Sequence, residues 1–123
     1  MTKKVAFLFP GQGSQAVGMG KDLYETSESA KQVFDTADEV LGKSITTMCF
    51  EGPEEALKQT VNTQPSIVTM SIAALEALRD KCEVIPSYVA GHSLGEYCAM
   101  YASGVMSLEN TLKAIQKRAD LMG

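Results

Sequence analysis

One short segment of the sequence places a serine in a setting that suits nucleophilic chemistry. GHSLG, residues 91–95, matches G-x-S-x-G between a predicted strand and a predicted helix. On such a turn the serine Oγ is exposed at the carboxyl edge of a sheet, and the free N–H groups of the following helix point toward it. The flanking glycines carry no Cβ, so strand and helix can approach closely. The pattern predicts Ser93 as a nucleophile at a site that stabilises a tetrahedral oxyanion.

A serine hydroxyl needs a general base, usually histidine, to attack effectively at neutral pH. The sequence contains one histidine, His92. Because His92 is adjacent to Ser93 along the backbone, we expect its side chain to point to a different side, and we interpret it as a residue that helps to shape the pocket. Either the base lies outside this chain, or the chain is inactive.

A second candidate segment, FPGQGSQA at residues 9–16, has two glycines after an apolar run. Read as G-x-G-x-x-A, residues 11–16 would form the phosphate-binding turn of a nucleotide-binding module. A Rossmann helix should begin within that motif, but Gly18 and Gly20 follow at once and disfavour it. The backbone amides of this loop are better assigned to a transient oxyanion, and the nucleotide-binding module is kept as the weaker alternative.

Composition limits the class of protein. With 123 residues, 45% hydrophobic and 21% charged, the chain suits one globular domain. A net charge of −4 without a Lys/Arg cluster argues against nucleic acid or an anionic membrane as partner. Without a long apolar run or a signal peptide, we expect a cytoplasmic protein. We interpret Cys49, Cys82 and Cys98 as reduced, buried thiols, and their spacing indicates no metal site.

The elements that must position these residues alternate between strand and helix. Hydrophobic periodicity and capping residues predict strands at 4–9 and 87–91 and helices at 29–41, 54–59, 65–81, 94–103 and 108–122. This order is typical of an α/β fold with parallel strands joined by helices, and the first strand should be buried on both faces. Two strands are too few for a complete sheet, so we expect a fragment.

Four motifs together resemble the malonyl-CoA:acyl carrier protein transacylase family. They are GHSLGEY at 91–97, FPGQGSQ at 9–15, TQPS at 63–66 and KRADLM at 117–122, in the family's order. The resemblance implies an α/β-hydrolase-like parallel sheet with flanking helices. It also implies that residues 1–123 are the N-terminal part of the large subdomain, with the ferredoxin-like small subdomain absent.

The resemblance further implies a reaction without a cofactor. Ser93 would take the malonyl group from malonyl-CoA as an acyl-serine ester and pass it to the phosphopantetheine thiol of acyl carrier protein, in fatty acid biosynthesis. Gln12 and Leu94 would supply the backbone N–H groups of the oxyanion hole. Gln64 would line the substrate pocket, which His92 helps to shape. Arg118 would bind the free malonyl carboxylate, which its planar guanidinium can hold with two parallel hydrogen bonds.

The family's catalytic histidine, a second glutamine and the small subdomain would all follow residue 123. We therefore expect the remaining C-terminal part of the same enzyme as a partner, and little transferase activity from this chain alone. A serine esterase or thioesterase of the α/β-hydrolase type is an alternative, since it shares the serine turn and sends the acyl group to water. Arg118 and the GQG loop argue against it.

Overall fold

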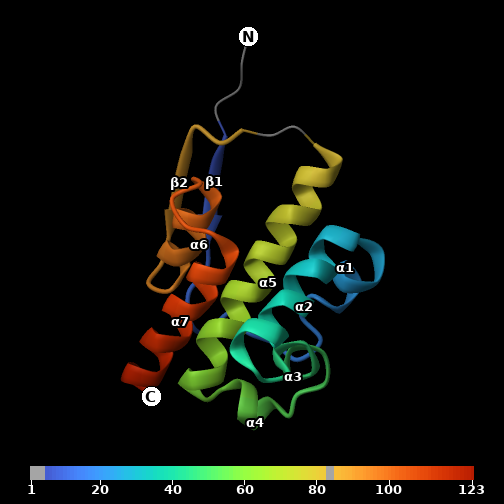
Figure 1. Cartoon of the computed structure of the whole chain (residues 1–123), viewed down its shortest axis with the longest axis vertical. Helices are drawn as coiled ribbons and strands as arrows, with labels where there is room; N and C mark the ends of the chain where they lie inside the picture. The colour runs from blue at the N-terminus through green and yellow to red at the C-terminus, as the bar shows by residue number, and fades with distance from the viewer. Residues whose placement is uncertain (1–4, 83–84) are drawn as a thin grey trace.

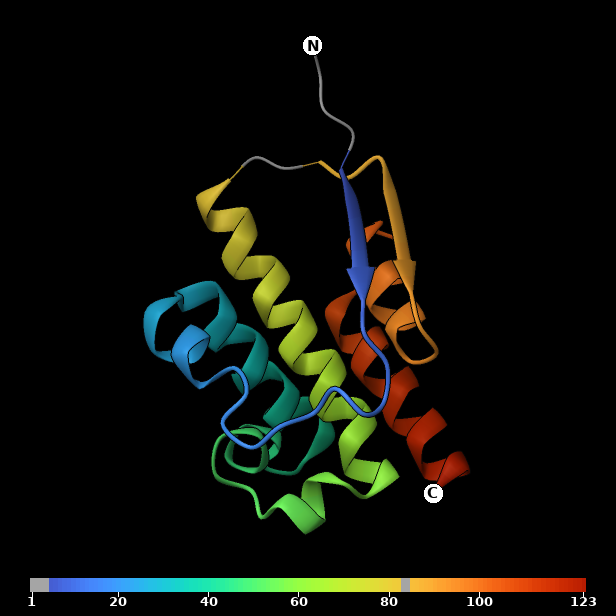
Figure 2. The same cartoon turned by 180° about the vertical axis from the view of Figure 1, so that it is seen from behind.

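The computed structural model describes residues 5–82 and 85–123 and has the predicted α/β order. The long helix α5 runs through the middle of the molecule, with α1 to α4 on one side and the strands, α6 and α7 on the other (Figures 1 and 2). The elements, in chain order, are β1 (Ala6–Phe9), α1 (Lys21–Thr26), α2 (Glu28–Leu41), α3 (Ile45–Glu51), α4 (Glu54–Leu57), α5 (Thr60–Lys81), β2 (Tyr88–Gly91), α6 (Gly95–Ala102) and α7 (Leu108–Met122).

The two strands form a parallel pair, as predicted. Their register places Ala6 opposite Tyr88 and Phe9 opposite Gly91, so both strands end at the same edge (Figure 2). A parallel pair needs a long crossover connection, which helices α1 to α5 provide here. Because both carboxyl ends meet, the two candidate segments that follow the strands lie at one edge of the sheet.

The prediction that the first strand is buried on both faces is wrong for its described part, residues 5–9. Helix α6 packs against the pair, and Phe9 is buried, but Leu8 is 77% exposed. Lys4, the first residue of the predicted strand, lies outside the described residues. The apolar run suggested two-sided burial, whereas in this structure an open apolar hollow lies between β1 and α5, lined in part by Leu8, Met70 and Leu78.

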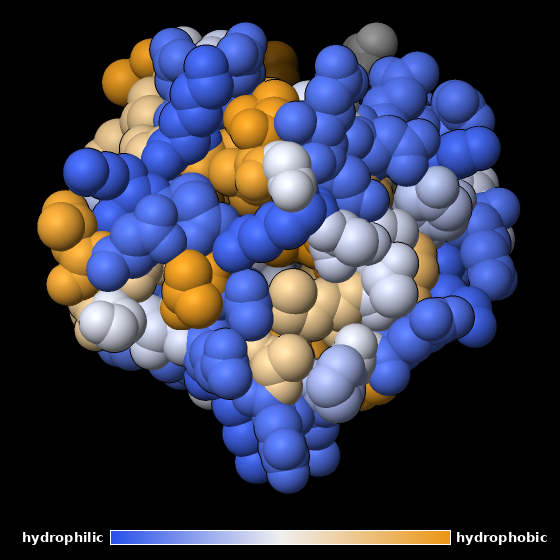
Figure 3. Space-filling model, turned by 60° about the horizontal axis from the view of Figure 1, so that its bottom comes forward, coloured by the Kyte–Doolittle hydropathy of each residue, from blue (hydrophilic) through white to orange (hydrophobic). Residues whose placement is uncertain are grey.

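The lower end of the molecule in Figure 1 has a mostly hydrophilic surface. Figure 3 shows this end turned forward, with hydrophilic side chains over most of the face and smaller hydrophobic areas between them. Within the described residues, no helix combines the length and the apolar character that crossing a membrane requires.

Three helix ends show how far local signals predict boundaries. Helix α2 ends at Leu41, as predicted, and its C-cap Gly42 has a left-handed φ of 66°. It begins at Glu28, one residue before the predicted start, because the N-cap is Ser27, whose Oγ accepts a hydrogen bond from the Ala30 N–H at 3.2 Å. Ser107 caps α7 as predicted, accepting from the Asn110 N–H at 3.1 Å. The short helices α1 and α3 were not predicted, and α4 is shorter than predicted.

Helix α5 begins at Thr60, five residues before the predicted start at Pro65. Proline has no N–H, so Pro65 cannot bond the carbonyl of Val61 one turn earlier. That carbonyl instead accepts hydrogen bonds from Lys43 Nζ at 3.1 Å and Gln116 Nε2 at 3.0 Å. The helix therefore continues through the proline because side chains from other elements replace the missing donor.

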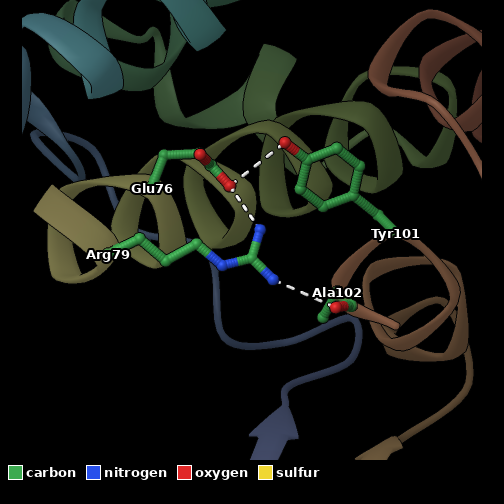
Figure 4. Close-up of polar contacts among 4 residues, drawn as sticks. All are labelled: Glu76, Arg79, Tyr101 and Ala102. Carbon is green, nitrogen blue, oxygen red and sulfur yellow. Dashed lines mark hydrogen bonds and ion pairs between the residues drawn. The ribbon is translucent and has the colours of Figure 1, made fainter. Parts of the chain in front are cut away.

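A polar cluster fixes the far end of α6 to α5 (Figure 4). The Arg79 guanidinium donates to Glu76 Oε1 at 2.8 Å and to the Ala102 carbonyl at 3.0 Å. The Tyr101 hydroxyl donates to the same Glu76 oxygen at 3.1 Å. Burial, together with the Glu76 charge, raises the pKa of Tyr101 to about 12, so its hydroxyl stays a donor at neutral pH. The end of α6 that is distant from Ser93 is thereby held in place.

The prediction of three buried thiols is correct for Cys49 and Cys98 and wrong for Cys82. Cys82 is exposed because it directly follows the last residue of α5, beyond the packed part of that helix. Burial raises the pKa of Cys49 to about 11 and that of Cys98 to about 12, so both remain protonated near pH 8.

We therefore predict that an aromatic disulfide reagent near pH 8 labels Cys82 quickly in the native protein and labels Cys49 and Cys98 only after unfolding. Absorbance of the released thiolate measures the number of fast sites. The matched variant Cys82→Ser should lose the fast phase. Rapid labelling of more than one thiol in native protein would contradict the burial of the other two.

Candidate active site

The turn after β2 has the sharp geometry that its sequence predicted. Ser93 has a φ of 56°, and it is the single non-glycine residue with positive φ in residues 5–82 and 85–123. The Gly95 N–H donates to the His92 carbonyl at 3.0 Å, and the Glu96 N–H donates to the Ser93 carbonyl at 3.1 Å. Left-handed backbone is costly for serine and is typical of functional turns. The exposed Ser93 side chain thus lies at the start of α6.

Three glycines allow the backbone segments around this turn to come into contact. A Cβ on Gly91 would lie 2.0 Å from the Gly95 carbonyl carbon, and a Cβ on Gly95 would lie 2.4 Å from the Phe9 carbonyl oxygen. A Cβ on Gly11 would lie 2.6 Å from His92 Nδ1. Distances this short exclude any side chain at these positions without movement. The FPGQG loop and the serine turn, predicted separately, are therefore packed directly against each other.

The structure brings Arg118, Gln64 and Ser93 together from three elements. Arg118 Nη2 donates to Ser93 Oγ at 3.0 Å, and Arg118 Nη1 donates to Gln64 Oε1 at 2.8 Å. Gln64 is fully buried in α5. The Arg118 guanidinium carbon also lies 5.9 Å from the ring centroid of Tyr97, within the range of a cation–π contact. The guanidinium is thus held beside the serine oxygen.

The backbone N–H groups of Gln12 and Leu94, predicted to form the oxyanion hole, are without an acceptor in the described part of the chain. The next N–H along each segment does have an acceptor, since the Gly13 N–H donates to Gln15 Oε1 at 2.8 Å and the Gly95 N–H donates to the His92 carbonyl at 3.0 Å. The Gln12 side chain turns toward Thr60, with 3.4 Å between Nε2 and Oγ1. Both amides are therefore available for a ligand, one in each of the two packed segments.

His92 is exposed, and its ring lies against Gly11. Within the described ranges no hydrogen bond joins its side chain to Ser93, and its role in shaping the pocket stays a prediction. In the same ranges, no group of three or more His, Cys, Asp or Glu side chains could hold a metal ion. The first helix after β1 begins at Lys21, outside the 11–16 motif, which disfavours the nucleotide-binding alternative.

Sequence reasoning missed two side chains of this site. Tyr97 lies under the guanidinium, four residues after Ser93, and the Met122 sulfur accepts a hydrogen bond from Gln64 Nε2 at 3.4 Å. Met122 is four residues after Arg118. Residues four apart on a helix are neighbours on its surface, so this spacing was the available signal for Met122. It gave no signal for Tyr97, because Ser93 lies before the first residue of α6.

Comparison with known proteins identifies the family to which the chain is similar. The model of the acyl transferase domain matches residues 6–123. The malonyl CoA-acyl carrier protein transacylase of Bacillus subtilis (strain 168) is 48% identical over 119 residues, which are 97% of this chain and 37% of that protein. The chain therefore spans well under half the length of this curated relative.

Two solved structures are similar over 98% of this chain and 39% of their own. One is the acyl-carrier-protein-S-malonyltransferase from Bartonella henselae, with 39% sequence identity and a TM-score of 0.94. The other is a malonyl-transacylase in complex with its type II PKS acyl-carrier protein, with 38% identity and a TM-score of 0.92.

The contact between the glycines leads to a stability prediction. Gly95→Ala should lower the free energy of unfolding by about 2–3 kcal/mol, because the new methyl meets backbone atoms of Phe9 that cannot turn away. Gly104→Ala is the matched control. Its φ is 83° but nothing lies within 4 Å of an added Cβ, so it should cost only about 1 kcal/mol. Denaturant titration measures both values, and equal losses would contradict the close contact.

Proposed function

We propose, since this chain belongs to the acyl transferase domain family, that it forms part of an enzyme that transfers malonyl from malonyl-CoA to acyl carrier protein. The observation that carries the proposal is the Arg118 guanidinium, which lies within hydrogen-bond distance of both Ser93 and Gln64. A nucleophile beside a cation suits an acyl group that ends in a carboxylate. The names of the similar proteins support the same substrates.

Transfer would proceed through an ester on Ser93. Its Oγ attacks the thioester carbon, the tetrahedral intermediate collapses, and the coenzyme A thiol leaves with a proton. The phosphopantetheine thiol of the carrier protein then attacks the ester and regenerates the serine. The backbone N–H groups of Gln12 and Leu94 would stabilise the oxyanion in both steps, and one such donor is typically worth roughly 2.7–4 kcal/mol of barrier.

Arg118 would select the acyl group by its length and charge. In a malonyl thioester a single methylene separates the carboxylate from the reacting carbonyl. The carboxylate must therefore bind close to the nucleophile, and Arg118 Nη2 lies 3.0 Å from Ser93 Oγ. The fork of the guanidinium can hold both carboxylate oxygens, which would orient the thioester for attack. Gln64 would keep the guanidinium in place through its own hydrogen bond, and His92 would shape the opposite wall beside Gly11.

Several finer features belong to the proposal alone. The fold would be the α/β-hydrolase-like core of a large subdomain, and the general base would come from the remaining C-terminal part of the same enzyme. Acyl carrier protein would be the second substrate, in fatty acid biosynthesis and in the cytoplasm. No observation of the site favours an esterase or a thioesterase, in which water would take the acyl group.

The proposal predicts that Arg118→Ala in the complete enzyme lowers kcat/KM for malonyl-CoA by about 100-fold, because a charge-assisted bidentate pair is lost. It should leave acyl-enzyme formation from acetyl-CoA nearly unchanged. Mass spectrometry of the acyl-serine and transfer to carrier protein are the measurements. Ser93→Ala is the control and should abolish both reactions. An unchanged preference for malonyl over acetyl in Arg118→Ala would refute the carboxylate role.

A second prediction concerns the 123-residue chain alone. Within residues 5–82 and 85–123, its single histidine makes no hydrogen bond to Ser93, so no imidazole there is in position to remove the serine proton. We expect little malonyl transfer from the purified chain, measured by the same acyl-serine assay, with the complete enzyme as positive control. Robust transfer by the chain alone would show that a base within it has been overlooked.

A further inference from the structure

Pro65 creates an unusual acceptor in the helix that carries Gln64. A carbonyl oxygen has two lone pairs, and one of them normally bonds the N–H four residues later. Val61 lacks that partner because residue 65 is proline. Its oxygen instead accepts from Lys43 Nζ at 3.1 Å and from Gln116 Nε2 at 3.0 Å. Both lone pairs are thus taken by side chains from outside the helix.

The two donors connect the α2–α3 loop and α7 to this carbonyl of α5. Lys43 lies between α2 and α3 and also donates to Asn62 Oδ1 at 3.2 Å. Gln116 lies on α7 and donates its second amide hydrogen to Asp120 Oδ1 at 2.9 Å. If the Gln116 amide were reversed, its oxygen would face the Val61 carbonyl and the Asp120 carboxylate, which are both acceptors. The hydrogen bonds therefore determine the orientation of the amide. Burial lowers the pKa of the Lys43 ammonium, and the Asp120 charge opposes this shift.

Gln116 and Arg118 flank the buried stripe of α7. At 100° per residue, they lie about 80° to either side of the centre of the stripe formed by the buried residues Thr111, Leu112, Ile115 and Ala119. Each side chain bonds α5, Gln116 at the Val61 carbonyl and Arg118 at the Gln64 amide. A bond at both edges opposes rotation of α7 about its own axis. The Gln116 bond ends on backbone and is the more rigid of the two.

We propose that Gln116 and Lys43, acting through the Val61 carbonyl that Pro65 leaves free, are positioning residues for Arg118. They hold α7 at the rotation that places the guanidinium between Gln64 and Ser93. The inference rests on the proposed function insofar as the guanidinium binds the substrate carboxylate. It adds residues that touch no substrate and act through the orientation of one helix.

The kinetic test uses the complete enzyme and compares kcat/KM for malonyl-CoA with that for acetyl-CoA. Gln116→Leu should lower the malonyl-to-acetyl ratio about tenfold with the acetyl value unchanged within about twofold, a difference near 1.4 kcal/mol. Gln116→Lys restores a donor to the Val61 carbonyl but sets a second ammonium beside Lys43, so it should recover only part of the ratio. Glu109→Gln, an exposed change in the first turn of α7, is the matched control and should have no effect. Equal losses for both thioesters would indicate a merely structural role.

A second variant separates positioning from stability. Pro65→Ala supplies an N–H that competes for the Val61 carbonyl, and it removes a proline from a helix interior. The melting temperature should therefore not fall, while the malonyl-to-acetyl ratio should fall at least threefold. If the ratio is unchanged in folded Pro65→Ala and folded Gln116→Leu, the inference is overturned.

A spectroscopic readout keeps this inference distinct from the proposed function. The guanidinium hydrogens of Arg118, followed by nuclear magnetic resonance without substrate, should exchange with water several-fold faster in Gln116→Leu than in the unchanged enzyme. Unchanged exchange would overturn the inference even if malonyl transfer is confirmed. Failure of the unchanged enzyme to transfer malonyl, with faster exchange in the variant, would reject the proposed function and retain the positioning role.

Discussion

Direct contact between backbone segments at Gly11, Gly91 and Gly95 is the constraint on which the candidate site depends. A Cβ at Gly11 or Gly95 would lie 2.6 or 2.4 Å from an atom of the other segment, and a Cβ at Gly91 would lie 2.0 Å from Gly95 within the serine turn. The contact sets the FPGQG loop against the serine turn and allows the His92 N–H to reach the Phe9 carbonyl at 3.0 Å. Free amides from both segments and the Ser93 hydroxyl are therefore brought to one edge of the sheet by the absence of side chains.

The remaining part of the site depends on helix packing at longer range. Helix α5 carries Gln64 and is fully buried over most of its first half, while α7 carries Arg118 on the edge of its apolar stripe. Polar contacts fix α6 to α5 through Arg79 and α7 to α5 through Gln116. Since α6 begins at the serine turn, Ser93 and the Arg118 guanidinium are both held in position relative to the central helix α5.

The sequence predicted features that depend on neighbouring residues and missed features that depend on contacts between distant parts of the chain. The sharp turn at Ser93 has a local cause and was predicted correctly, whereas the chemical role of Ser93 stays a prediction. The start of α5 was not, because the helix passes Pro65 only with donors from Lys43 and Gln116, 18 and 55 residues from Val61. Exposure of Leu8 and Cys82 depends on which elements cover them, and residue type alone carries no such information. The Arg118–Gln64 bond also joins distant residues; the family motifs implied a site role for each residue, and no pattern in the sequence predicted the bond between them.

The two arginines of the chain have different hydrogen-bond partners, and this difference explains why Arg79 serves packing while Arg118 can bind an anionic ligand. Arg79 donates to the Glu76 carboxylate and to a helix-end carbonyl, so its charge is balanced and its donors serve the packing of α6 on α5. Arg118 donates to a neutral amide oxygen and a neutral hydroxyl, and no carboxylate of residues 5–82 or 85–123 forms an ion pair with it. A guanidinium held by neutral partners keeps its full attraction for an anion, since a bound carboxylate would be its first opposite charge. Because one of those partners is Ser93 Oγ, an anion that takes over the Nη2 donor would also lie next to the serine oxygen. In the proposed reaction, a single hydrogen-bonding group would therefore couple anion binding to acyl attack.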